Sequence, residues 1–171
     1  MKNKDIILGL LYEKNLTGYE INEIFKQIFS HFYDASFGMI YPTLRKLSDK
    51  GLVEKKVVVQ EGRPNKNVYI LTEDGKKEFI NSLNTKLFPE VRRSDFLMRM
   101  YFGEHFDNKK VINLINCEIE DKKKLIDQLK NNLNKWNNMS LTQEISFKVG
   151  INQYMVEIET LQEYIKKLSE K

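Results

Sequence analysis

Two adjacent basic side chains, Arg45 and Lys46, occupy a segment whose residue spacing predicts an amphipathic helix. An arginine guanidinium can make two hydrogen bonds to a guanine edge or a phosphate, whereas a lysine ammonium acts as a point charge. On a helix of 3.6 residues per turn, residues 36–51 separate into a packing face and a free face. The packing face holds Ile40, Leu44 and Leu47, and the free face holds Gly38, Met39, Pro42, Arg45 and Lys46. The segment therefore predicts DNA recognition, with a solvated basic helix face as the alternative.

The start of this helix has two candidate positions. Pro42 lacks an N–H and is tolerated only in the first turn, so a start near Gly38 or Met39 fits it. Ser36 is the alternative N-cap, because its hydroxyl can accept a hydrogen bond from a free backbone N–H.

The composition excludes several other classes of protein. The chain has 171 residues with 41% hydrophobic content, which is enough to bury a core. Its longest apolar run, residues 6–12, is far shorter than the roughly 20 residues of a membrane span, and no signal peptide precedes it. One cysteine and two separated histidines provide neither a disulfide framework nor a metal-ligand spacing. We therefore expect a cytoplasmic protein that needs no cofactor, metal or membrane.

The charge and the motifs favour binding over catalysis. The net charge is only +4, but residues 36–77 contain nine basic and five acidic side chains. This local excess fits contact with phosphates. We find no glycine-rich phosphate loop, no nucleophile elbow and no convincing pair of catalytic carboxylates, so we expect no enzyme activity.

The elements before the basic helix complete a helix-turn-helix. A first helix is expected over residues 4–14, and Thr17 with Glu20 forms a capping box that begins a second helix. An aromatic connection, residues 29–34, leads to the basic helix. Its aromatic side chains pack under the joint or line a ligand pocket.

The elements after the basic helix predict a wing and the end of a domain. Gly51 ends the helix, and residues 52–60 and 67–71 are expected as strands of a hairpin. The hairpin tip carries Arg63 and Lys66, positioned for phosphate or minor-groove contact. Thr72 caps a fourth helix, which Pro89 is expected to stop. Its expected buried side chains are Phe79, Ile80, Leu83 and Leu87.

The second half of the chain is helical throughout. A short helix is expected over residues 93–106, followed by two long helices separated by residues 137–140. Each long helix has one apolar seam with steps of three or four residues, interrupted only by Lys122 in the first. Such helices need each other and a second chain, although packing on the first domain is an alternative. The side chains expected in a homodimer interface are Ile115, Ile119, Ile126, Leu129, Leu133, Trp136, Tyr154, Ile158, Leu161 and Ile165.

The sequence therefore predicts a mainly α protein with a small β-hairpin. Residues 1–90 are expected to form an N-terminal winged helix-turn-helix DNA-binding domain. Residues 91–171 are expected to form a C-terminal helical, coiled-coil-like dimerisation domain.

Three motifs resemble the PadR family of bacterial transcriptional regulators, in its branch with a longer helical C-terminal domain. They are Thr-Gly-Tyr-Glu-Ile at residues 17–21, Gly-Met-Ile-Tyr-Pro-Thr-Leu-Arg-Lys-Leu at 38–47, and Tyr-Ile-Leu-Thr-Glu-Asp-Gly at 69–75. The Ile-Tyr-Pro-x-Leu-Arg-x-Leu run is the most specific of these signals. Weaker signals are Asp95-Phe96-Leu97, Phe102-Gly103 and Gly150.

The resemblance implies a dimeric repressor that binds an inverted-repeat operator and is released by a small aromatic or drug-like ligand. It places Tyr19, Ser36, Met39, Tyr41, Pro42 and Arg45 at or near the major groove, with Arg63 and Lys66 on the wing. Tyr41 either reaches a phosphate or packs beneath the helix. Trp136, Tyr154 and the Phe32-Tyr33 pair are candidate ligand contacts, or else core residues. The alternative function is a winged-helix module that binds another protein without specific DNA binding.

Overall fold

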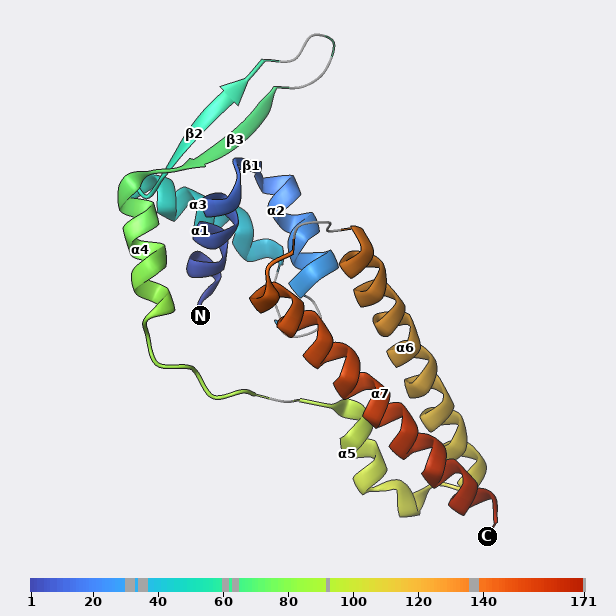
Figure 1. The fold of residues 1–171 in the computed structure, drawn as a ribbon. Helices are drawn as coiled ribbons and strands as arrows, with labels where there is room; N and C mark the ends of the chain where they lie inside the picture. The colour runs from blue at the N-terminus through green and yellow to red at the C-terminus, as the bar shows by residue number, and fades with distance from the viewer. Residues whose placement is uncertain are drawn as a thin grey trace. The chain divides into compact units, whose positions relative to one another are not determined.

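The computed structural model describes residues 1–29, 33, 37–59, 62, 65–91, 93–135 and 139–170. The fold is mainly helical with one small sheet (Figure 1). The chain divides into two compact units, Met1–Glu90 and Val91–Lys171, and each is considered by itself.

Three helices of the first unit form the expected helix-turn-helix with a supporting helix. They are α1 (Asn3–Glu13), α2 (Gly18–Ile24) and α3 (Ile40–Asp49). A π-helical turn, η1 (Phe25–Phe29), extends α2, and a 3₁₀ turn, η2 (Phe37–Met39), precedes α3. Helix α1 begins one residue earlier than expected, because the Asp5 carboxylate accepts a hydrogen bond from the Lys2 N–H at 2.8 Å. Met39 occupies the N-cap of α3, which places Pro42 in the first turn, and Ser36 lies outside the described residues.

The sheet has three antiparallel strands in the order β1-β3-β2. The strands are β1 (Leu16–Thr17), β2 (Val53–Val58) and β3 (Lys66–Leu71). The β2–β3 hairpin, which forms the expected wing, projects from the helices of this unit (Figure 1). Strand β1, which pairs Leu16 with Tyr69, was not expected, because two residues are too short to show an alternating pattern.

The junctions around the wing follow the sequence signals. Gly51 has a φ of +68°, and its N–H donates to the Ser48 carbonyl at 2.9 Å, which ends α3 as expected for a glycine after the C-cap. The Thr72 hydroxyl donates to the Gly51 carbonyl at 2.8 Å and accepts from the Gly75 N–H at 3.1 Å. Thr72 therefore caps α4 (Glu73–Leu83) and fastens it to the end of α3.

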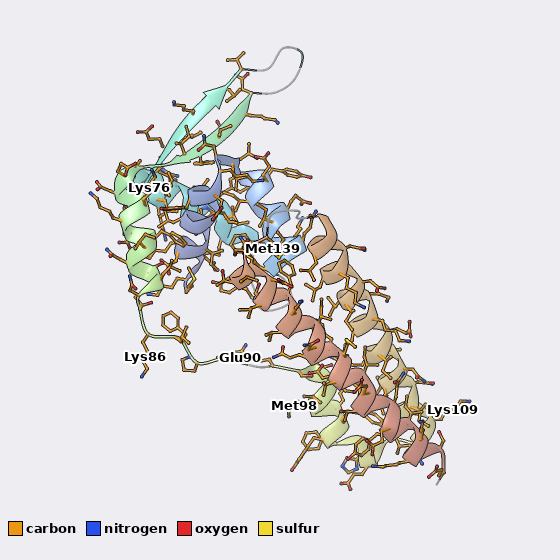
Figure 2. The ribbon with its side chains drawn as sticks, in the orientation of Figure 1. Lys76, Lys86, Glu90, Met98, Lys109 and Met139 are labelled. Carbon is orange, nitrogen blue, oxygen red and sulfur yellow. The ribbon has the colours of Figure 1, made fainter. Side chains whose placement is uncertain are left out.

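Helix α4 ends earlier than the sequence analysis expected. Of the four side chains expected to be buried on it, only Phe79 packs on the core, and Leu87 is 91% exposed. Ser82, Asn84 and Thr85 donate side-chain hydrogen bonds to carbonyls of the last turn. Because such bonds compete with the helical ladder, the chain leaves the helix well before Pro89. Lys86 and Glu90 lie on the extended segment that follows (Figure 2).

One hydrophobic core holds the first unit together. Helices α1, α2 and α3, the turn η1 and all three strands contribute to it. The buried side chains are Ile7, Leu8, Leu11, Leu16, Ile21, Phe25, Ile40, Leu44, Leu47, Val53, Tyr69 and Leu71. The expected packing face of α3 is therefore confirmed.

The second unit is built from α5 (Asp95–Tyr101), the 3₁₀ turn η3 (Gly103–His105), α6 (Asn108–Lys135) and α7 (Leu141–Ser169). Helices α6 and α7 lie side by side along their length (Figure 1). Three side chains of α7 pack against a buried cluster on α6. The α7 side chains are Ile158, Leu161 and Ile165, and the α6 cluster is Val111, Ile115 and Ile119. Ile126, Leu129, Phe147 and Ile151 are also buried. The two predicted seams therefore meet within one chain; Leu133 and Tyr154 are half-buried, and Trp136 lies outside the described residues.

Lys122, the polar residue in the first seam, is held by a compact ionic cluster. Its side chain is only 13% exposed and pairs with Glu118 at 3.0 Å and with Glu157 of α7. Its ammonium also lies 5.3 Å from the centre of the Tyr154 ring. Burial lowers the pKa of Lys122, but the hydrogen bonds to Glu157 and Glu118 outweigh it, and the net pKa is raised.

Candidate nucleic-acid interface

Helix α3 presents one free face of the kind that fits a DNA groove. Met39, Tyr41, Pro42, Arg45 and Lys46 are exposed, whereas the opposite side of the helix is buried in the core. A shallow, open hollow lies over Tyr41, Pro42, Arg45, Lys46 and Asp49. Arg45 and Lys46 form no ion pair with any residue that the structure describes. The face therefore offers two uncommitted cations and little bulk at Pro42.

The first turn of α2 is fixed beside this face by the expected capping box. The Thr17 N–H donates to the Glu20 carboxylate at 2.7 Å, and the Glu20 N–H donates to the Thr17 hydroxyl at 3.1 Å. The hydrogen bonds from the Thr17 N–H and hydroxyl lower the pKa of Glu20. This capped turn holds Tyr19, which is 66% exposed, at the start of α2.

Gly18 lets the ring of Tyr41 lie directly against α2. A Cβ atom on Gly18 would come within 2.6 Å of the Tyr41 Cε1 atom, which is closer than van der Waals contact allows. Tyr41 nevertheless remains 59% exposed. The ring therefore packs on the first turn of α2 and keeps an exposed side, whereas its contact with a phosphate stays a prediction.

Tyr69 of β3 connects the same region to the wing. Its side chain is buried in the core, and its backbone pairs with Leu16 of β1. Burial raises the pKa of Tyr69, and the nearby Tyr41 adds to the increase. Tyr69 thus links the base of the wing to β1 through its backbone and to Tyr41 of α3 through its side chain.

The wing carries more positive charge than the sequence analysis assigned to it. Lys66 is exposed at the start of β3, opposite Val58, whereas Arg63 lies outside the described residues. Lys55 and Lys56 of β2 are also exposed, and neither has an ionic partner in the described part of the hairpin. These two lysines were not among the site residues predicted from the sequence. Two adjacent lysines in a strand predicted to form the wing could have indicated them as phosphate contacts.

The aromatic joint before α3 packs on the core where it is described. The Phe25 ring meets Phe29 edge-on with centroids 5.5 Å apart, and it meets Tyr33 at 6.3 Å. The Tyr33 hydroxyl donates to the Asn3 side chain of α1 at 2.5 Å. Burial raises the pKa of Tyr33, and Asp5 adds to the increase. These contacts favour the packing alternative for Tyr33, whereas Phe32 lies outside the described residues.

The described residues contain neither a metal site nor a membrane-spanning helix. No three histidine, cysteine or acidic side chains gather there in a way that could hold a metal ion. In the same residues, no helix combines the length and the apolar character needed to cross a bilayer.

Comparisons with known proteins agree with this geometry. Residues 7–81 match the model of the transcriptional regulator PadR-like family. The negative transcriptional regulator PadR of Bacillus subtilis is 29% identical over 133 residues, which cover 77% of this chain and 73% of that protein.

Several solved structures match over nearly the whole chain. A PadR-like transcriptional regulator from Bacillus cereus is 44% identical with a TM-score of 0.90, covering 98% of this chain and 96% of that chain. Bacillus subtilis PadR in complex with operator DNA is 25% identical with a TM-score of 0.82, covering 96% of this chain and 98% of that chain.

Proposed function

This chain belongs to the PadR-like family of transcriptional regulators, and we propose that it acts as a dimeric repressor at an inverted-repeat operator. The family is one of DNA-binding regulators and not of enzymes, as the sequence analysis expected. The observation that carries the proposal is the free face of α3, where Arg45 and Lys46 are exposed and form no ion pair with a described residue.

The proposed contacts divide between base recognition and backbone binding. Arg45 reads a base edge in the major groove, because its planar fork can bind two acceptors at once. Tyr19, Ser36, Met39, Tyr41 and Pro42 line the same groove around it. Lys46, Lys66 and Arg63 bind phosphates, which supply affinity without sequence choice. The solved complex of Bacillus subtilis PadR with operator DNA supports the proposal that this chain binds DNA.

The proposed homodimer is supported by apolar side chains that the second unit leaves uncovered. On α5, Met98 and Tyr101 are exposed, and the Met98 side chain points away from α6 and α7 (Figure 2). On α7, Leu141, Ile145 and Val156 are exposed. A continuous α6–α7 seam does not bury these residues, so a second copy would cover them. Two copies would place two α3 helices about 34 Å apart, one DNA turn.

The proposed release mechanism requires a ligand that binds the DNA-bound and released forms with different affinities. Bacillus subtilis PadR has been crystallised with p-coumaric acid, a small aromatic acid. We propose a small aromatic or drug-like effector for this chain as well, acting in the cytoplasm, where the operator is found.

Substitution of the two arginines tests the proposal against a winged-helix module that binds only protein. We expect Arg45→Ala to cost about 1–3 kcal/mol of operator binding and to reduce the preference over random DNA. We expect Arg63→Ala to weaken operator and random duplexes alike, if it contacts phosphate. Lys77→Ala serves as the control, because Lys77 is exposed on α4 and paired with Asp74 at 3.0 Å. Unchanged DNA binding by both arginine variants would favour the protein-binding alternative.

A further inference from the structure

A lysine-lined cleft lies on the first unit, where the N-terminus of α1 meets the second half of α3 and the side of α4. Its volume is about 340 Å³. The polar side chains that line it and carry the argument are Lys2, Lys4, Thr43, Lys46, Lys50 and Glu78. We call this feature the lysine cleft.

The charges of the lysine cleft are not balanced within it. Glu78 is the acidic residue in the lining, and its carboxylate is already hydrogen-bonded to the Lys4 ammonium. This pairing raises the pKa of Lys4, which therefore stays charged. Lys2, Lys46 and Lys50 have no ionic partner within the described ranges. By contrast, Lys76, Lys77, Lys123 and Lys124, on α4 and α6, all pair with acids three residues away.

Two further features of the lysine cleft favour an anion. Thr43 is only 9% exposed, and its hydroxyl has no hydrogen-bond partner among the described residues, so a donor remains available in the cleft wall. Lys2 occupies the N-cap of α1, where the Asp5 carboxylate accepts a hydrogen bond from its backbone N–H, but the Lys2 ammonium has no ionic partner in the part of the chain that the structure describes. A bound anion would supply the Thr43 hydroxyl with an acceptor and the Lys2 ammonium with a counterion.

We propose that the lysine cleft binds a phosphate group. Either the DNA backbone or free phosphate could supply it. Lys46 favours the backbone, because it lines both the lysine cleft and the hollow on the free face of α3. A strand whose bases meet Arg45 would then pass a phosphate across Lys46 to Lys50 and Lys2. The backbone version rests on the proposed function, whereas the free-phosphate version does not.

Salt-dependent DNA binding of the full-length protein tests the backbone version. The variants are Lys2→Gln and Lys50→Gln, with Lys86→Gln as the control, because Lys86 is an exposed lysine that lies outside the cleft (Figure 2). Fluorescence anisotropy would measure affinity for a random duplex over a salt series. Each cleft variant should reduce the slope of log affinity against log salt by about 1, which corresponds to one lost phosphate contact. Lys86→Gln should leave the slope unchanged.

Thermal unfolding in inorganic phosphate, against chloride at equal ionic strength, tests the free-phosphate version. A ligand that binds the folded state raises Tm. If phosphate raises the Tm of the wild type and not of the cleft variants, while their salt slopes are unchanged, the site binds free phosphate. If neither the slope nor the phosphate effect differs from those of wild type and Lys86→Gln, the proposal is wrong. A wild type that does not prefer its operator but shows the Tm effect would refute the proposed function alone.

Discussion

The close approach of Gly18 to Tyr41 gives a sharp test of the interface, through the substitution Gly18→Ala. The added Cβ would lie 2.6 Å from Cε1 of the Tyr41 ring and 3.1 Å from Cζ. Because the obstacle is the side of an exposed ring and not backbone, the ring can move outward. The substitution therefore displaces Tyr41 while leaving the core behind α3 intact.

The expected effects on stability nearly cancel. Gly18 is the first residue of α2, where alanine is favoured over glycine by up to about 1 kcal/mol. A displaced ring costs about 0.5–1.5 kcal/mol. The free energy of unfolding should thus change by less than about 1 kcal/mol, or less than about 8 °C in Tm for a domain of this size. Loss of one DNA contact costs about 1–3 kcal/mol, so operator affinity should fall about 5- to 150-fold.

Fluorescence anisotropy on operator DNA and thermal unfolding measure the two effects separately. Tyr41→Ala removes the ring, so adding Gly18→Ala to it should cause no further loss of affinity. The reasoning is refuted if Gly18→Ala binds the operator like the wild type. It is also refuted if the double variant loses the full effects of both single variants, because the two residues would then act independently.

Three further predictions concern stability, and urea unfolding checks each of them. Gly75→Ala should destabilise the first unit by about 1–3 kcal/mol, because the added Cβ would lie 2.1 Å from the Leu52 carbonyl oxygen. Gly38→Ala is the control: no heavy atom lies within 4 Å of its added Cβ, so the free energy of unfolding should change little. Lys122→Met should destabilise the second unit by about 2 kcal/mol, since the half-buried Glu118 and Glu157 lose their shared cation; an unchanged midpoint would contradict this. The folded-state pKa of Glu20 lies below its ordinary value of 4.5, so its stabilisation is present above pH 4.5 and is lost as pH falls through the lower value. The advantage of wild type over Glu20→Gln should accordingly disappear in acid, and an advantage that persists there would exclude charge as its source.

Elements fixed by local chemistry were predictable from the sequence. The buried face of α3 follows from the spacing of Ile40, Leu44 and Leu47, and each of these side chains is buried in the core. The Thr17–Glu20 capping box and the positive φ of Gly51 depend only on neighbouring residues. Each signal lies within a few positions, so no tertiary information was needed.

Features that depend on long-range contacts were not predictable in the same way. Periodicity showed that Ile115 and Ile158 lie on apolar seams, but it could not tell whether the partner seam belongs to the same chain. The structure shows that α6 and α7 cover each other, so a dimer needs additional surface. Likewise, the lysine cleft joins residues near positions 2, 46 and 78, which no motif links.

The most direct test of the central claim is fluorescence anisotropy with the full-length protein and two duplexes. One duplex is the DNA upstream of the protein's own gene, and the other is its scrambled counterpart, each measured over a salt series. We predict tight binding to the first duplex, weaker binding to the second, and a steep salt dependence for both. Equal, weak binding to both duplexes would contradict recognition of that site by α3.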